Sequence, residues 1–180
     1  MNEEIDDFER MISSLIGDIK ISLRYLTEVE ANQFWRRTYI RTVFAFIEAL
    51  IFHIKRVLLR VYDAGIVEFS PEELAMLREE SYDLSDKGDV VTQQKFIPLT
   101  KNLKFICKAY VRYTKSNYTL KVDDSGWDSF KKSIDIRNRL THPKSASDLD
   151  VSDDDIKVVE RADNWFKEVT RALLELKDSA

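Results

Sequence analysis

An arginine, an amide and a histidine lie close together in the segment 133–147, which reads SIDIRNRLTHPKSAS. They are Arg137, Asn138 and His142, and Pro143 follows the histidine directly. Proline disfavours the α conformation of the residue before it, so a helix through this segment is expected to end at about Thr141. That break frees the imidazole of His142 to turn toward the face that carries Arg137 or Asn138. The segment therefore predicts a permanently charged guanidinium, an amide and a titratable imidazole in one small patch.

This combination of groups suits a phosphodiester. Cleavage of RNA by its own 2′-hydroxyl requires that the hydroxyl lose a proton, that the leaving 5′-oxygen gain one, and that the extra charge on the phosphate be stabilised. A histidine can transfer the protons, and an arginine can hold the phosphate oxygens through two parallel hydrogen bonds. No carboxylate cluster near the segment would hold a metal ion, so we expect chemistry without a metal or another cofactor.

The segment from Ile134 to Pro143 resembles the motif of the HEPN superfamily (higher eukaryotes and prokaryotes nucleotide-binding domain). Members share an arginine, four to six residues and then a histidine, often with Asn, Asp or His directly after the arginine. Here four residues intervene between Arg137 and His142, and Asn138 occupies the favoured place. The setting is similar too, because the motif lies at the end of a penultimate helix, before a final amphipathic helix.

The resemblance implies a metal-independent endoribonuclease of the kind found in toxin–antitoxin pairs and phage defence. Two subunits would pair so that their motifs form one composite site, and the products would be a 2′,3′-cyclic phosphate and a 5′-OH. Arg137 would bind the scissile phosphate, His142 would be the general acid or base, and Asn138 would orient either of them. The expected partners are RNA, a second copy of the chain, and an antitoxin or another defence protein.

Other interpretations of the motif stay open. Basic residues near a helix C-terminus and a proline just beyond it are ordinary stop signals, so Arg137 and His142 could simply finish a helix. Some superfamily members lack nuclease activity, and the alternative function is a helical module that binds RNA, nucleotide or protein, or that serves only for dimerisation.

Glu48 and Thr141 are candidates for supporting roles. Glu48 lies in the most apolar run of the chain, VFAFIEALIFHI. It is either a buried carboxylate that orients Arg137 across the bundle or an edge residue that pairs with Arg41, Lys55 or solvent, because a buried charge must be paired or neutralised. His53, in the same run, is expected to be structural.

A second candidate site is a basic face. Residues 90–122 contain seven basic residues and no acidic residue, in a chain of net charge -4, so the rest of the chain carries -11 (-4 minus 7). Such a face could follow an RNA backbone, with Tyr110, Tyr113 or Tyr118 stacking on bases, or could dock an acidic partner such as an antitoxin. It is also what any solvated amphipathic helix shows. Its members on one helix are Lys101, Lys104, Lys108, Arg112 and Lys115.

The elements that must position these groups are helices. Only 4 Gly and 3 Pro occur in 180 residues, which favours long helices over many short strands. Apolar residues at spacings of three and four, with capping signals, predict helices over about 3–30, 34–62, 71–85, 98–113 and 127–141 and from Ser152 onward, with a loop or short extended piece over 86–97. We therefore expect an all-α, antiparallel bundle of five to six helices, forming a single domain over 1–180.

The remaining features exclude other classes of protein. The acidic start has no apolar core typical of a secretory signal, and the run 43–54 is too short to span a membrane. Cys107 is the single cysteine, which excludes an internal disulfide and suggests a cytoplasmic setting.

The aspartates at 148, 150 and 153–155 are expected to serve the start of the last helix rather than a cation. Asp135 and Arg139 are expected to form a surface pair, and Trp35, Trp127 and Trp165 to pack in the core or in a dimer contact.

Overall fold

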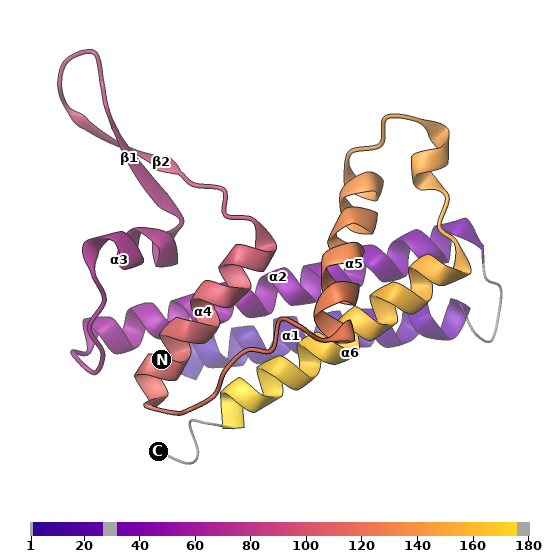
Figure 1. Cartoon of the computed structure of the whole chain (residues 1–180), viewed down its shortest axis with the longest axis horizontal. Coiled ribbons are helices and arrows are strands. Elements are labelled where there is room, and N and C mark those ends of the chain that lie inside the picture. The colour runs from indigo at the N-terminus through magenta and orange to yellow at the C-terminus, as the bar shows by residue number, and fades with distance from the viewer. Residues whose placement is uncertain (1, 27–31, 176–180) are drawn as a thin grey trace. The chain divides into compact units, whose positions relative to one another are not determined.

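The fold is all-α, as the sequence predicts. The computed structural model describes residues 2–26 and 32–175, with side chains from residue 7 onward within these ranges, and this part of the chain forms six α-helices and one β-hairpin (Figure 1). The elements in chain order are α1 (Asn2–Arg24), α2 (Gln33–Asp63), α3 (Pro71–Arg78), β1 (Glu80–Leu84), β2 (Val90–Gln94), α4 (Leu99–Thr114), α5 (Ser125–Thr141), the 3₁₀ helix η2 (Ala146–Leu149) and α6 (Asp153–Glu175).

The chain divides into two compact units. Unit 1 comprises Met1–Leu50 and Lys121–Ala172, and unit 2 comprises Ile51–Leu120 and Leu173–Ala180. The segment that carries Arg137, Asn138 and His142 belongs to unit 1, and the basic face belongs to unit 2.

The core of unit 1 is built from the apolar stripes of α2, α5 and α6. Phe130 of α5 stacks on Phe166 of α6 with 6.1 Å between ring centroids, and both rings are fully buried. Trp127 and Trp165 lie 5.6 Å apart in this core, as expected. A Cβ atom at Gly126 would come within 2.0 Å of the Trp165 ring, so the start of α5 packs directly on α6.

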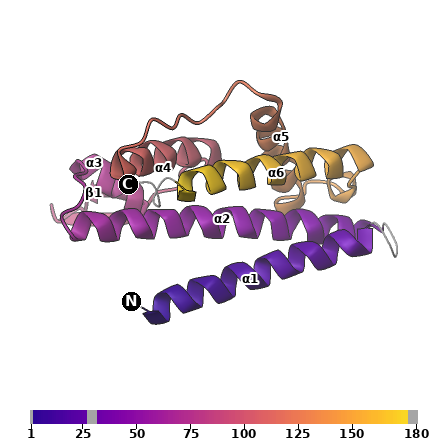
Figure 2. The same ribbon diagram turned by 90° about the horizontal axis from the view of Figure 1, so that it is seen from below.

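Helix α1 and the first half of α2 run in opposite directions and lie closest where α1 ends and α2 begins (Figure 2), as two long helices with a short link should. At the junction, Trp35 stacks on Tyr25 with 4.1 Å between ring centroids, so the third tryptophan is half-buried against α1 rather than part of the central core. Helix α1 ends at Arg24, before the expected limit at residue 30, and residues 27–31 lie outside the described part of the chain.

Unit 2 contains the clearest departure from the predicted elements. Helix α3 ends at Arg78 and not near residue 85, because Glu79 adopts a left-handed conformation with φ of 57°. The chain then forms the antiparallel hairpin β1–β2, with Glu80 opposite Gln94 and Leu84 opposite Val90, which extends away from α3 and α4 (Figure 1). The predicted extended piece is thus confirmed as β2, and β1 was mistaken for helix.

Buried polar contacts support unit 2. The ammonium of Lys55, which is 2% exposed, donates to the carboxylate of Glu79 at 2.7 Å and to the Met76 carbonyl at 3.3 Å. Burial lowers the pKa of Lys55, and the hydrogen bond and charge of Glu79 act against that shift. The left-handed residue that ends α3 therefore also neutralises a buried cation of α2. None of the described helices is long and apolar enough to cross a membrane.

Candidate functional site

Helix α5 carries the motif on its last turn. Asp124 caps the helix start by accepting a hydrogen bond from the Trp127 N–H at 2.7 Å. At the other end the helix stops at Thr141, as predicted, and His142 leaves the α conformation with φ of −127° and ψ of 59°. Its N–H still donates to the Asn138 carbonyl at 2.9 Å, while its side chain is exposed. Pro143 explains the stop, since it disfavours an α conformation at residue 142.

Arg137 is held from three directions. Its Nη2 donates to the carboxylate of Glu48, its Nη1 donates to Oδ1 of Asn138 at 3.0 Å, and its guanidinium carbon lies 5.3 Å from the centre of the Phe44 ring. Burial lowers the pKa of Arg137 from its ordinary value, but a guanidinium remains protonated in proteins. The side chain is 23% exposed, so the cation is oriented by its neighbours yet still reaches solvent.

The structure combines the two alternatives for Glu48, because the residue lies at an edge position and its carboxylate nevertheless contacts Arg137. Its side chain is 49% exposed, because its position on α2 lies at the edge of the helix–helix contact. Of the three partners considered, the contact formed is with Arg137. Arg41 instead donates to the Leu140 carbonyl at 3.4 Å, and Lys55 pairs with Glu79 in unit 2. Thr141 is exposed, and its hydroxyl donates to the Arg137 carbonyl at 2.8 Å, so it stabilises the last turn of α5.

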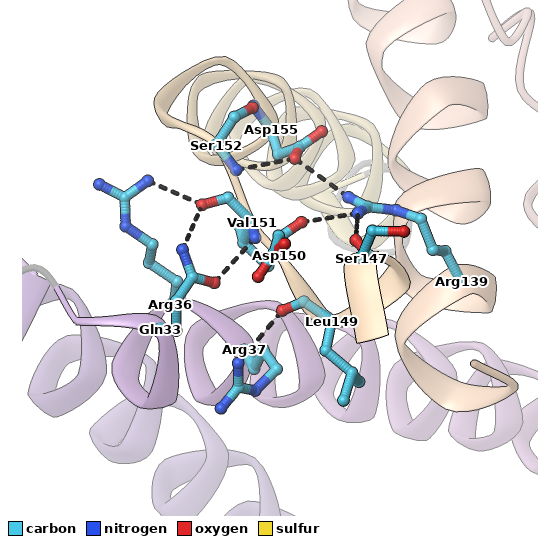
Figure 3. A network of polar contacts seen from close by, with 10 residues as sticks. All are labelled: Gln33, Arg36, Arg37, Arg139, Ser147, Leu149, Asp150, Val151, Ser152 and Asp155. Atoms are coloured by element: carbon cyan, nitrogen blue, oxygen red, sulfur yellow. Dashed lines mark hydrogen bonds and ion pairs between the residues drawn. The ribbon is translucent and has the colours of Figure 1, made fainter. Parts of the chain in front are cut away.

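The segment after His142 is fastened to α5 and α6 by Arg139 (Figure 3). Nη1 of Arg139 donates to the Asp150 carbonyl at 2.6 Å and to the Ser147 carbonyl at 3.4 Å, and Nη2 donates to Asp155 at 3.0 Å. The expected pair between Asp135 and Arg139 is therefore wrong. The preference for Asp155 follows from the chain reversal, which brings the start of α6 beside the end of α5.

The same segment is fastened to α2 through its backbone (Figure 3). The Gln33 amide exchanges two hydrogen bonds with Val151, donating to its carbonyl at 3.0 Å and accepting from its N–H at 2.8 Å. Arg36 also donates to the Val151 carbonyl, at 2.9 Å, and Arg37 donates to the Leu149 carbonyl at 3.1 Å. The chain that follows His142 is thus held along two sides. These contacts have no sequence signal, because each joins a side chain to a backbone group more than 100 residues away.

Two aspartates after the motif serve two different helix starts: Asp155 serves the start of α6, as expected, whereas Asp148 serves the start of η2. Asp148 accepts hydrogen bonds from the N–H groups of Lys144 and Ser145 at 2.7 and 2.9 Å, and these bonds lower the pKa of Asp148. Asp155 and Ser152 cap α6 reciprocally, at 2.9 and 3.1 Å. In the described part of the chain, no group of three or more His, Cys, Asp or Glu residues could hold a metal ion.

The basic face on α4 is partly committed to structure. Both terminal nitrogens of Arg112 donate to the carboxylate of Glu73, which lowers the pKa of Glu73 and joins α4 to α3. Tyr110 is buried, so it belongs to the core and is not presented for stacking on a base. Four lysines of the face have exposed side chains, namely Lys101, Lys104, Lys108 and Lys115.

No protein-family model matches this chain, and no similar protein was found among curated proteins or solved structures. The chemistry of the residues themselves therefore carries the functional argument.

Proposed function

We propose that this protein is a metal-independent endoribonuclease that cleaves RNA to 2′,3′-cyclic phosphate and 5′-OH ends. The observation that carries the proposal is the arrangement on the last turn of α5. There the guanidinium of Arg137 is oriented by Glu48 and Asn138, and His142 is exposed at the helix end. An arginine has five N–H donors. In the described part of the chain the side-chain hydrogen bonds of Arg137 go to two acceptors, which leaves donors for phosphate oxygens.

Each residue has a distinct role in the proposed reaction. His142 accepts the proton of the 2′-hydroxyl, whose oxygen attacks phosphorus while the bond to the 5′-oxygen breaks. Arg137 stabilises the charge that accumulates on the phosphate, and Glu48 and Asn138 hold its guanidinium in one orientation. The leaving 5′-oxygen needs a proton from a second group, which is the His142 of a second copy if two motifs face each other across a homodimer. We place the enzyme in the cytoplasm, as a toxin or a phage-defence effector with an antitoxin or defence partner.

The test compares wild-type protein with His142→Ala, Arg137→Ala and the control Arg10→Gln on mixed cellular RNA in EDTA. Arg10 is a suitable control because it lies on α1 and pairs with Asp7 on its own helix. We expect wild type and the control to cut, leaving cyclic-phosphate ends, and His142→Ala to lose activity by a factor of about 10² to 10⁴. Removing Arg137 should cost a factor of about 10² to 10³. Equal cutting by all four proteins, or none by a folded wild type on any RNA, would overturn the proposal.

A second candidate function is RNA or protein binding without catalysis, through the basic face of α4. The observation that favours it is the row of exposed lysines at 101, 104, 108 and 115, which no described aspartate or glutamate interrupts on that helix. Replacing Lys101 and Lys108 by glutamine should weaken RNA binding in this case and leave any cleavage chemistry of bound RNA unchanged.

A further inference from the structure

We propose that Arg37 and Arg41 form a binding site for backbone phosphates of RNA, beside the end of α5 that carries His142. This inference rests on the proposed function, because it names the part of the substrate that α2 would hold. Neither arginine belongs to the sequence motif, and the sequence predicts for Arg41 only a possible ion pair with Glu48.

The geometry places both guanidiniums along the segment that begins at the motif. Arg37 and Arg41 are four residues apart on α2, so their side chains leave the helix on the same face. Arg41 reaches the Leu140 carbonyl at 3.4 Å, two residues before His142, and Arg37 reaches the Leu149 carbonyl at 3.1 Å, where η2 ends. The two cations thus lie at the two ends of the segment that His142 opens.

The charge of these two arginines is not compensated in the way that the charge of their neighbours is. Arg36 pairs with Asp153, Arg137 with Glu48 and Arg139 with Asp155. For Arg37 and Arg41, by contrast, the bonds within residues 7–26 and 32–175 go to backbone carbonyls, and in Figure 3 the single dashed line from Arg37 runs to Leu149. A carbonyl satisfies one N–H but carries no net charge, so each cation keeps its charge and most of its five donors.

The chemistry of this pair matches a polyanion with repeated phosphates. The planar fork of a guanidinium fits two oxygens of one phosphate, and two forks on one helix face can engage successive phosphates of a strand. Arg41 is exposed and Arg37 is partly buried, so both reach solvent. A strand held here would run past the imidazole of His142, which is what a cleavage site needs.

The test measures RNA binding without cleavage, in protein that carries His142→Ala. A labelled, mixed-sequence single-stranded RNA is titrated at several salt concentrations, and the affinity is read from fluorescence anisotropy. Arg37→Gln and Arg41→Gln are compared with Arg10→Gln, which removes the same charge from α1. Glutamine can still donate to a carbonyl, so a purely structural role is largely preserved in both variants. Urea unfolding of each variant checks that the fold is intact.

We expect Arg37→Gln and Arg41→Gln each to weaken binding and to reduce the magnitude of the slope of log K against log salt by about 0.7, with Arg10→Gln unchanged. Arg41→Lys should restore most of the slope, because it restores the charge. Equal affinity and slope for all Gln variants, or no salt-dependent RNA binding, would overturn the proposal.

The outcomes for the site and for the nuclease can be told apart. If wild-type protein fails to cut RNA while the two variants lose binding as expected, the nuclease proposal fails and the phosphate site stands. If wild-type protein cuts RNA and the variants keep both KM and affinity, the phosphate site fails and the nuclease proposal stands.

Discussion

At the scale of single residues, the contact between Glu48 and Arg137 offers the sharpest test of how the site is organised. Glu48→Ala removes the acceptor that orients the guanidinium, and a misplacement of about 1 Å can cost a factor of about 10² in rate. We therefore expect a loss of this order in single-turnover RNA cleavage, with Glu48→Gln retaining part of the activity through its amide oxygen.

The exposed Glu168 of α6 provides a matched control for that substitution. Glu168→Ala removes the same charge and volume and should cleave RNA like wild type. If Glu48→Ala and Glu168→Ala cleave at equal rates, Glu48 has no part in orienting Arg137.

The buried carboxyl group of Asp163 makes the stability of unit 1 depend on pH. It is 4% exposed, one carboxylate oxygen has no hydrogen-bond partner among the described residues, and the other accepts from Lys167 at 2.6 Å. Burial raises the pKa of Asp163, and Lys167 acts against that shift. Because the folded-state pKa lies above the unfolded value, the folded state is penalised as pH rises from the unfolded pKa through the folded one.

We expect Asp163→Asn to remove this penalty. The free energy of unfolding is measured in urea for the variant and for wild type, and the gain of the variant over wild type should be larger at about pH 7 than at about pH 4. A difference between variant and wild type that is constant over this range would contradict the assignment.

At the scale of elements, the pair of Glu73 and Arg112 joins α3 to α4. Glu73 also completes the capping box at the start of α3 by accepting from the Ser70 N–H at 3.0 Å. Arg112 lowers the pKa of Glu73, so the stabilisation is present above the unfolded pKa and is lost as pH falls through the folded one. The two side chains are 46% and 27% exposed, so solvent and salt screen the pair.

Glu73→Gln should therefore lower the free energy of unfolding by up to about 1 kcal/mol at neutral pH, because the ion pair with Arg112 is lost while the glutamine amide oxygen can still accept from the Ser70 N–H. The loss should shrink in high salt and nearly vanish at acidic pH, where Glu73 is protonated in both states. Urea unfolding at two pH values measures it, and Asp86→Asn in the exposed hairpin turn serves as the control. A loss that is the same at both pH values would show that the charge of Glu73 is irrelevant.

The elements also show what sequence reasoning could reach. Helix α6 begins directly after Ser152 as predicted, because a cap and an apolar stripe with helical spacing specify the same start. Strand β1 was missed because Tyr82, Leu84 and Val90 share one face that is exposed, so burial imposes no clear alternation on the sequence. Helix α3 looked longer than it is because its end depends on the conformation of Glu79, a residue type that rarely adopts positive φ.

At the scale of the whole molecule, what the sequence left open is the set of contacts between distant segments. Arg137, Asn138 and His142 were found from their spacing, and the helix end beside them from Pro143. Glu48 and Arg137, 89 residues apart, could be named only as one of several pairings, since charge alone does not tell which helix faces meet. Arg41 illustrates the same limit, because its partner is a carbonyl that the sequence cannot indicate.

The hairpin also makes unit 2 a convenient scaffold for engineering. None of the residues in β1 or β2 is buried. The two residues that flank the hairpin are adjacent in space, because the Lys95 N–H donates to the Glu79 carbonyl at 2.6 Å. Replacing residues 80–94 by Asn-Gly should therefore close the chain with a tight turn. We expect unchanged urea unfolding and higher soluble yield, because an exposed apolar strand pair is removed. Cooperative unfolding at much lower urea would contradict this. The same position is then an insertion site at which a fluorescent reporter or an affinity tag can be added without disturbing the helices.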